Sequence, residues 1–279
     1  MLQSSPTLDQ YNRDGYLSPI DVMSSSEAEN IRQDLEQAEA ELKNDPESLA
    51  LLRAYPDRLL PSFDELVRHP NIINEVSKIL GGDLMVWSAG LFDKTPHSDK
   101  IVSWNQDLTY WGLDDVQEVT AWFALSPSTL ASGCMKFIPG SHKKKLVPHV
   151  DTFSDKNLLT RGQEVAVEVD ESDAVAVELQ TGQISLHHGH LIHSSGPNTT
   201  PNRRVGAAIR YIKPSMKQVT DDKSLVRLVS GEDHFHHFKL AAAPSGRLAR
   251  EDFESCAEDA RIKRKILYAG AEDQQGTRY

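Results

Sequence analysis

The sequence is poor in cysteine and has no long apolar run. Its 279 residues include two cysteines, Cys134 and Cys256, too few for a disulfide framework, which fits a reducing, cytoplasmic location. No apolar run approaches the ~20 residues that a membrane helix needs, so we expect no membrane partner. The opening segment MLQSSPTLDQ lacks the basic and apolar regions of a secretory signal, and we expect no such signal.

The chain also lacks an excess of basic residues. Lys and Arg number 30 against 41 Asp and Glu, a formal net charge of −11, which argues against nucleic acid as a partner. The basic run Lys143–Lys145 is most simply a solvated loop; a contact to an anionic substrate is the alternative. With 39% hydrophobic and 25% charged residues, the composition is that of a globular protein, and nothing in it specifies an oligomeric state.

The first third of the chain has helical patterns. Ser24 and Glu27 have the spacing of a capping box. An apolar stripe follows and predicts a helix with one buried face; it consists of Ile31, Leu35, Ala38 and Leu42. Pro70 and the pair Gly81–Gly82 predict the start and the stop of another helix.

From residue 83 onward, short β-type segments alternate with turn residues. EVAVEVD (164–170) and AVAVELQ (174–180) alternate as half-buried antiparallel strands do. Many short strands without intervening helices predict a sandwich, jelly roll or barrel. We expect one domain over 1–279: a mostly helical part (1–82), a β core (83–213) and a C-terminal extension (214–279) that ends in a helix.

Four histidines crowd one short segment, and two arginines follow it. His187, His188, His190 and His193 fall within seven positions, which favours a metal or proton-transfer site, although core or surface roles fit most of them individually. If a strand continued through them, His188 and His190 would share one face and His187 and His193 the other. The pair Arg203–Arg204 is either solvated or includes an arginine that binds a dicarboxylate.

Asp107 adds a carboxylate to these histidines. A mononuclear non-haem iron site uses two imidazoles and one carboxylate on one face. Asp107, on an expected strand, and His193 would be two such ligands, and position 105 would complete the set if it were His. It is Asn105.

These segments resemble the phytanoyl-CoA dioxygenase family of Fe(II)/2-oxoglutarate-dependent oxygenases. The resemblance runs from about Tyr11 to Lys213 and is carried by YNRDGYLSP, SWNQDLTYWGL, VTAWFALSPSTLASGCMKFIPGSHK and LHHGHLIHSSGPNTTPNRRVGAAIRYIKP. It implies a mainly β fold, a double-stranded β-helix (jelly roll) braced by N-terminal helices. It also implies Fe(II) as cofactor and 2-oxoglutarate as cosubstrate.

The resemblance assigns roles residue by residue. Asp107 and His193 are metal ligands, and Arg204 binds the far carboxylate of 2-oxoglutarate. Ser195 assists Arg204, and Trp122 lines the cosubstrate pocket or packs as a core aromatic. Other candidates for the substrate pocket, each with plain packing as its alternative, are Phe92, Lys94, Tyr110, Trp111 and His188.

Asn105 departs from the family pattern, which has His as the first iron ligand at this position. An amide oxygen is a poorer ligand for iron than imidazole, so we expect weak iron binding and little turnover. The substitution is either introduced or natural, and a natural Asn105 fits a degenerate enzyme or a two-ligand site with water in place of the imidazole. Because Asp107 is retained, we expect hydroxylation or desaturation, not halogenation.

The expected reaction consumes O₂ and 2-oxoglutarate and releases succinate and CO₂ while a small organic molecule is oxidised. No basic cluster marks a coenzyme A site, which favours a small metabolite as substrate. Two alternatives remain open: a catalytically inactive oxygenase-fold protein that binds a small molecule or partner, and a non-iron metal protein. The latter would use the histidine cluster or the segment HFHHF, with His234, His236 and His237.

Overall fold

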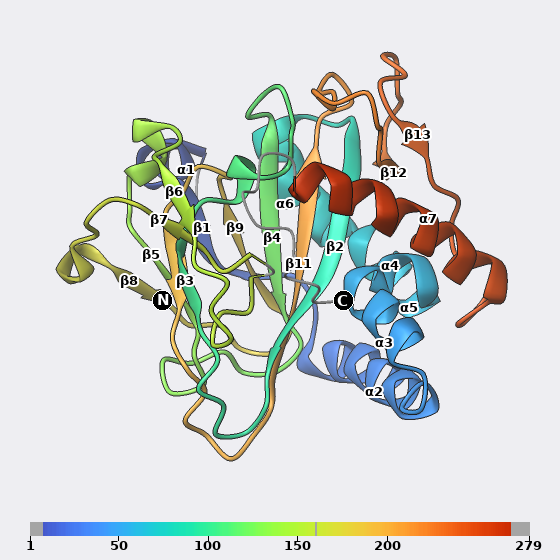
Figure 1. The fold of residues 1–279 in the computed structure, drawn as a ribbon, viewed down its shortest axis with the longest axis horizontal. Helices are drawn as coiled ribbons and strands as arrows, with labels where there is room; N and C mark the ends of the chain where they lie inside the picture. Colours follow the sequence, from blue (N-terminus) through green and yellow to red (C-terminus); the bar gives the residue numbers. More distant parts are fainter. Residues whose placement is uncertain (1–7, 160, 269–279) are drawn as a thin grey trace.

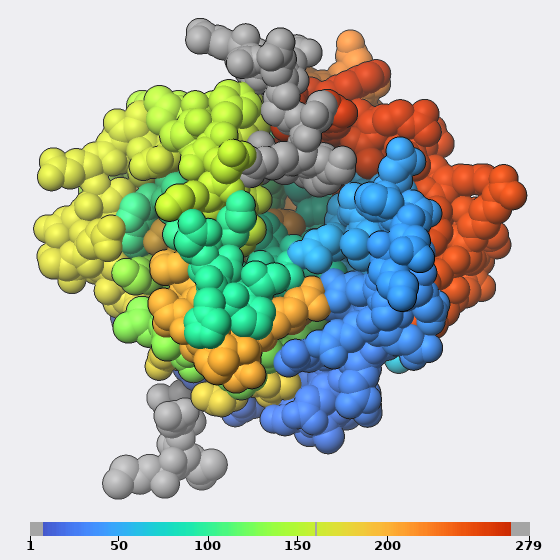
Figure 2. Space-filling view, turned by 60° about the horizontal axis from the view of Figure 1, so that its bottom comes forward, coloured from blue at the N-terminus to red at the C-terminus, as the bar shows by residue number. Residues whose placement is uncertain are grey.

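The computed structural model describes residues 8–159 and 161–268. Residues 1–7 and 269–279 of the predicted single domain lie outside the described residues. The two larger β-sheets face each other, and helices cover the outer face of one of them (Figure 1). In Figure 2 the N-terminal helices (blue) lie next to the C-terminal helix (red), with the yellow-green segments on the other side. No helix among the described residues is both long and apolar enough to span a membrane.

Two helices have the predicted signals at their ends. Ser24 and Glu27 form the capping box of α2 (Ser25–Glu41), in which the backbone N of Ser24 donates to Glu27 Oε2 at 2.8 Å. Helix α6 (Pro70–Leu80) ends at Gly81, whose φ of 90° is unfavourable for other residues. The other helices are α1 (Leu8–Asp14), α3 (Pro46–Ala54), α4 (Pro56–Leu59), α5 (Pro61–Val67) and α7 (Arg250–Leu267).

The larger sheet has seven strands in the order β1-β9-β4-β11-β2-β12-β13. All neighbours pair antiparallel except β12 and β13, which are parallel. The strands are β1 (Tyr16–Asp21), β9 (Gln183–His187), β4 (Glu118–Ala124), β11 (Arg204–Ile212), β2 (Leu84–Lys94), β12 (Leu225–Ser230) and β13 (Lys239–Leu240).

The smaller sheet has four strands and packs face to face against the larger one. Its order is β3 (Val102–Asn105), β10 (His193–Ser195), β5 (Met135–Phe137) and β8 (Val175–Val177). Trp122 and Ala208 of the larger sheet share one apolar cluster with Phe137 and Val177 of the smaller sheet. Two facing antiparallel sheets confirm the predicted jelly roll with helical additions. A separate pair is β6 (His149–Asp151) with β7 (Gln163–Val165).

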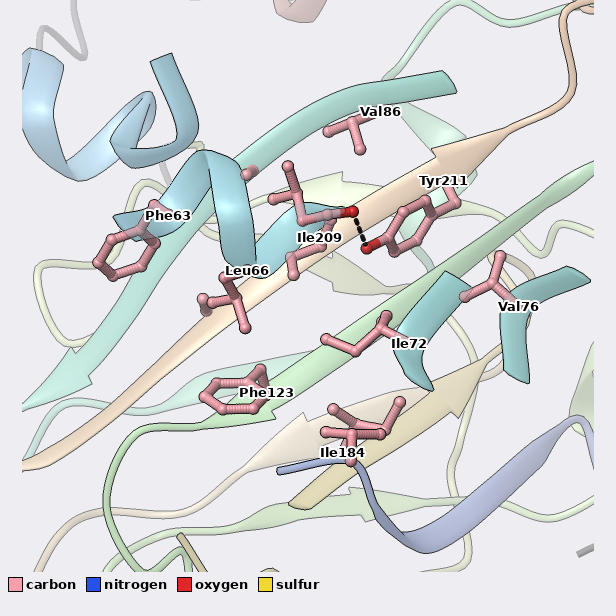
Figure 3. Close-up of a cluster of buried hydrophobic side chains, with 14 of the residues drawn as sticks. Phe63, Leu66, Ile72, Val76, Val86, Phe123, Ile184, Ile209 and Tyr211 are labelled. Carbon is pink, nitrogen blue, oxygen red and sulfur yellow. Dashed lines mark hydrogen bonds between the residues drawn. The ribbon is translucent and has the colours of Figure 1, made fainter. Parts of the chain in front are cut away.

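The main core lies between the helices and the outer face of the larger sheet. In Figure 3 the side chains of α5 and α6 meet those of β2, β4, β9 and β11. The Tyr211 hydroxyl donates to the backbone oxygen of Val67 at 2.9 Å, which joins β11 to α5 (Figure 3). This layer fixes one face of β11, and alternate residues on its other face point between the two sheets.

Three local expectations differ from the structure. Residues 16–21 form β1, an edge strand of the larger sheet, within the part expected to be helical. Strand β3 ends at Asn105, and Asp107 begins a short 3-10 helix, η1 (Asp107–Thr109). Of the alternating segment EVAVEVD (164–170), only Glu164 and Val165 are in a strand, β7 (Gln163–Val165). Alternation predicts these faces from side chains alone, whereas strand ends depend on which backbone groups find partners across the sheet.

Candidate metal and cosubstrate site

One carboxylate and two imidazoles meet between the two sheets. Asp107 is the first residue of η1, His187 the last of β9 and His193 the first of β10. Their ligand atoms lie within 4.8 Å of one another. His187 Nε2 is 3.5 Å from Asp107 Oδ2, and His193 Nε2 is 3.8 Å from Asp107 Oδ1. In the part of the chain that the structure describes, this is the one such grouping of three metal-ligating side chains.

The turn between β9 and β10 brings the two histidines together. The strand does not continue through the histidine segment; the chain leaves the larger sheet after His187 and enters the smaller sheet at His193. Gly189 lies in this turn, where an added Cβ would be 2.5 Å from both Leu108 Cγ and Glu118 Oε2. Gly189 also accepts a hydrogen bond from the backbone N of Leu108 at 3.1 Å, which holds η1 against the turn.

The protonation states of the three side chains suit a divalent metal. Burial acts to raise the pKa of Asp107, but the His187 imidazole and the charges of His193 and Arg210 hold this pKa well below its usual value. Burial lowers the pKa of His187, so its ring is neutral at neutral pH. His193 Nδ1 lies 2.9 Å from the backbone oxygen of Leu191, to which it donates, and this leaves Nε2 as the acceptor that faces Asp107. The donor set fits Fe(II).

Buried cations without an anionic partner lie in the same region. The Arg204 guanidinium is 3% exposed and donates to the backbone oxygens of Phe92 and Gly133, at 3.2 and 3.1 Å. Lys94 is 1% exposed, and its Nζ donates to Ser195 Oγ at 2.7 Å. Burial, and next the charge of Arg204, lower the pKa of Lys94 to about 7. Among the described residues neither cation forms an ion pair, so a dicarboxylate would supply the missing negative charge.

Trp122 forms one wall beside Arg204. The Arg204 Cζ lies 5.3 Å from the centroid of the Trp122 ring. The ring packs over Gly206 of β11, where an added Cβ would overlap it. The three metal-ligating side chains and Arg204 line the same cavity. The residues that line it are Phe92, Val102, Asp107, Thr120, Trp122, Met135, Leu159, His187, His193, Ser194, Ser195, Arg204, Ala208 and Arg210.

Three other candidates for the substrate pocket, Tyr110, Trp111 and His188, do not line this cavity. Trp111 stacks on Trp87 with ring centroids 4.9 Å apart, and Tyr110 faces His149 at 5.7 Å. His188 contacts the rings of His142 and His190 and does not line the cavity. Arg203, the neighbour of Arg204, pairs with Glu39 and Asp93 away from the cavity.

The two exposed histidines of the HFHHF segment face acidic neighbours. His234 Nε2 lies 3.6 Å from Glu232, and His236 Nδ1 lies 3.7 Å from Asp233. The His237 and Phe235 rings are tilted against each other, with centroids 5.7 Å apart. Within the described residues this segment gathers no group of three metal-ligating side chains.

Several residues at the site were missed from the sequence. Thr120 Oγ1 lies 3.0 Å from Asp107 Oδ2 and 2.8 Å from Glu118 Oε1. Burial, and next the charge of Asp107, raise the pKa of Glu118 well above its usual value. The Thr120 hydroxyl therefore lies between two carboxyl groups, and burial favours the neutral form of Glu118. Arg210 also lines the cavity, between the rings of Phe92 and Trp111 at 5.5 Å each.

The sequence signals for these residues were weak. Thr120 and Arg210 are opposite each other in the register of β4 and β11, which only the strand pairing reveals. His187 had a signal, the density of histidines between 187 and 193, but that density did not distinguish it from His188 or His190.

Comparisons with known proteins identify the family of the chain. The model of the phytanoyl-CoA dioxygenase (PhyH) family matches residues 11–206. A probable phytanoyl-CoA dioxygenase of Caenorhabditis elegans is 26% identical over 188 residues, 65% of this chain and 60% of that protein. A probable alpha-ketoglutarate-dependent hypophosphite dioxygenase of Stutzerimonas stutzeri is 26% identical over 220 residues, 72% of this chain and 76% of that protein.

A solved structure extends the similarity to most of the chain. The non-heme monooxygenase ThoJ, in its apo form, superposes with a TM-score of 0.84 at 30% identity, over 94% of this chain and 97% of that one. The region matched by the family model, residues 11–206, includes Asp107, His187, His193 and Arg204. The chain belongs to the phytanoyl-CoA dioxygenase family of Fe(II)/2-oxoglutarate-dependent oxygenases.

Proposed function

We propose that the chain is a working dioxygenase that oxidises a small organic molecule by hydroxylation or desaturation, with Fe(II) and 2-oxoglutarate. One observation carries this: a single cavity is lined by both a metal-ligating triad and a buried arginine that lacks an anionic partner among the described residues. A purely structural cavity would have no use for either feature, because unpaired buried charges are costly.

Each end of the cavity has its own task. Asp107 and His193 would hold the metal, and Arg204 would bind the far carboxylate of 2-oxoglutarate with help from Ser195. Lys94 donates to Ser195 and adds a second positive charge there. Trp122 closes the wall beside Arg204 and keeps water away from the charged contact.

Fe(II), when bound, supplies the activation of O₂ that couples decarboxylation of 2-oxoglutarate to oxidation of a C–H bond. The residues of the chain position the reactants around it. Thr120 keeps the Asp107 carboxylate oriented, and the contact with Glu118 keeps Thr120 oriented. Products of hydroxylation are succinate, CO₂ and an alcohol that carries one oxygen atom of O₂.

The impairment predicted from Asn105 depends on the absence of another imidazole. His187 lies beside Asp107 and His193, so the ligand count can be complete without position 105. We therefore propose that this chain binds Fe(II) and turns over as it stands. No observation favours the inactive alternative.

The substrate is proposed to be a small molecule. The relatives are named for phytanoyl-CoA and for hypophosphite, which differ greatly in size, so family membership leaves the substrate open. The two cysteines are free and buried, which is consistent with the proposed cytoplasmic location.

Succinate formation tests the proposed function without knowledge of the substrate. The unaltered chain with Fe(II), O₂ and 2-oxoglutarate should release succinate slowly, and Arg204→Gln should release much less. If the unaltered chain releases none and binds no 2-oxoglutarate, the proposed function is wrong.

A further inference from the structure

His187 has surroundings that suit a metal ligand: a buried imidazole whose Nε2 faces the Asp107 carboxylate at 3.5 Å. Its side chain is buried, and neither ring nitrogen has a hydrogen-bond partner in the described structure. The nearby rings are those of Phe137 and His193, with centroids 5.2 and 5.1 Å away, and the phenyl ring offers no partner for a polar atom. Burial of an unsatisfied polar group costs roughly 1–3 kcal/mol. A metal held beside the Asp107 carboxylate would give Nε2, the nitrogen that faces this carboxylate, a partner.

Asn105 has a different role, which its hydrogen bonds define. Its Nδ2 donates to the backbone oxygen of Ser103 at 2.9 Å and to that of His193 at 3.1 Å. Asn105 and His193 are also partners in the register of β3 and β10. The Asn105 amide therefore joins the end of β3 to the start of β10 by a hydrogen bond. Asn105 does not line the cavity.

Asn105 and His187 come from different sheets. Asn105 ends a strand of the smaller sheet, whereas His187 ends a strand of the larger one. The Asp107 carboxylate faces both histidines, with Oδ2 turned toward His187 and Oδ1 toward His193. A third ligand from β9 thus faces the same carboxylate as the ligand from β10.

We infer that the second imidazole of this metal site is His187, and that Asn105 is a positioning residue that holds His193 and does not ligate the metal. The ligand set is still two imidazoles and one carboxylate, with one imidazole moved from the end of β3 to the end of β9. This inference rests on the proposed function, because it names the ligands of that same site.

Cysteine variants with Co(II) test the ligand directly. In His187→Cys, Co(II) should give the near-ultraviolet charge-transfer absorption of a cobalt–thiolate bond; in the matched variant Asn105→Cys it should give none. Charge-transfer absorption in Asn105→Cys with none in His187→Cys would overturn the inference.

Binding and folding measurements separate a ligand from a structural residue. His187→Ala should weaken anaerobic Co(II) binding by more than about 100-fold, beyond what loss of a supporting residue costs, whereas Asn105→Ala should weaken it less than about 10-fold. Melting of the metal-free chains checks that His187→Ala and Asn105→Ala are folded before metal is added. If His187→Ala fails to fold, His187→Gln replaces it.

The double variant Asn105→His/His187→Ala supplies the reciprocal test. It should regain Co(II) binding that His187→Ala alone has lost, because the imidazole returns to the end of β3. Equal metal affinity in the parent and in His187→Ala would refute the inference while leaving the proposed function intact. Failure of the parent to bind Co(II) or Fe(II) at all would instead refute the proposed function.

Discussion

At the scale of single residues, Arg203 and Arg204 are neighbours with opposite environments. Arg204 is buried in the cavity without an ion pair in the described structure, and Arg203 pairs with Glu39 at 2.6 Å. Arg204→Gln should weaken 2-oxoglutarate binding by about 10- to 100-fold, because a charge-assisted contact contributes roughly 1.5–3 kcal/mol. Titration calorimetry checks this. Arg203→Gln is the matched control, and an equal loss in both variants would count against Arg204 as the anchor.

Lys94 should make cosubstrate binding depend on pH. Its pKa is lowered to about 7 by burial and Arg204, so the charged form that attracts a carboxylate is present below pH 7 and is lost above it. The dissociation constant of 2-oxoglutarate should therefore rise between about pH 7 and 9 in the parent and stay flat in Lys94→Met. Titration of both proteins with 2-oxoglutarate across this pH range tests the prediction. A flat profile in the parent would exclude Lys94 from the contact.

Most residues of the site were predicted from the sequence, but His187 was not singled out. Asp107, His193, Ser195 and Arg204 follow from the motifs, and the structure brings all four to one cavity. His187 could not be chosen from the sequence, because its role depends on where β9 ends and how the turn at 189 folds back.

At the scale of elements, the cosubstrate wall depends on a close approach between two strands. Gly206 of β11 leaves room for the Trp122 ring of β4. In Gly206→Ala the ring must move, which should lower 2-oxoglutarate affinity by about tenfold or more, since small misplacements are costly at preorganised sites. Gly90→Ala on β2 is the control, because its added Cβ would meet Arg210 Nη1 at an ordinary 3.6 Å. Equal affinities in the two variants would contradict the packing argument.

The strands were predicted from alternation and turn residues, and the fold class followed from them. The edge strand β1 was missed because residues 16–21 precede a helical region and pair with β9, more than 160 residues later in the chain. Pairing at such sequence separation leaves no local signal.

At the scale of the whole molecule, α7 is attached through a buried charge cluster. Asp259 is 0% exposed and contacts Arg58 at 3.3 Å and Lys263 at 3.1 Å. Asp259→Ala leaves both cations without this partner and should lower the free energy of unfolding by about 3–5 kcal/mol. The exposed pair Arg250–Glu254 offers the control, since Glu254→Ala should cost less than about 1 kcal/mol. Urea denaturation measures both, and similar losses would contradict the assignment.

Asp57 should give the fold an acid-side pH dependence. Burial raises its pKa from 3.8 to about 6 against the opposing charges of Arg58 and Lys263, so between these values the folded chain binds more protons than the unfolded chain. This group's contribution to stability therefore falls as pH rises from about 4 to 6, by an amount on the order of 3 kcal/mol. Relative to Asp57→Asn, the parent should lose stability over that range. Parallel pH profiles of the free energy of unfolding in the parent and in Asp57→Asn would contradict this prediction.

The central claim is that the chain with Asn105 holds a complete metal and cosubstrate site. Anaerobic titration of the unaltered protein with Fe(II) in the presence of 2-oxoglutarate tests it most directly, through the metal-to-ligand charge-transfer absorption of chelated 2-oxoglutarate. We predict absorption that saturates at one Fe(II) per chain in the parent. Absorption that appears only after Asn105→His would contradict the claim.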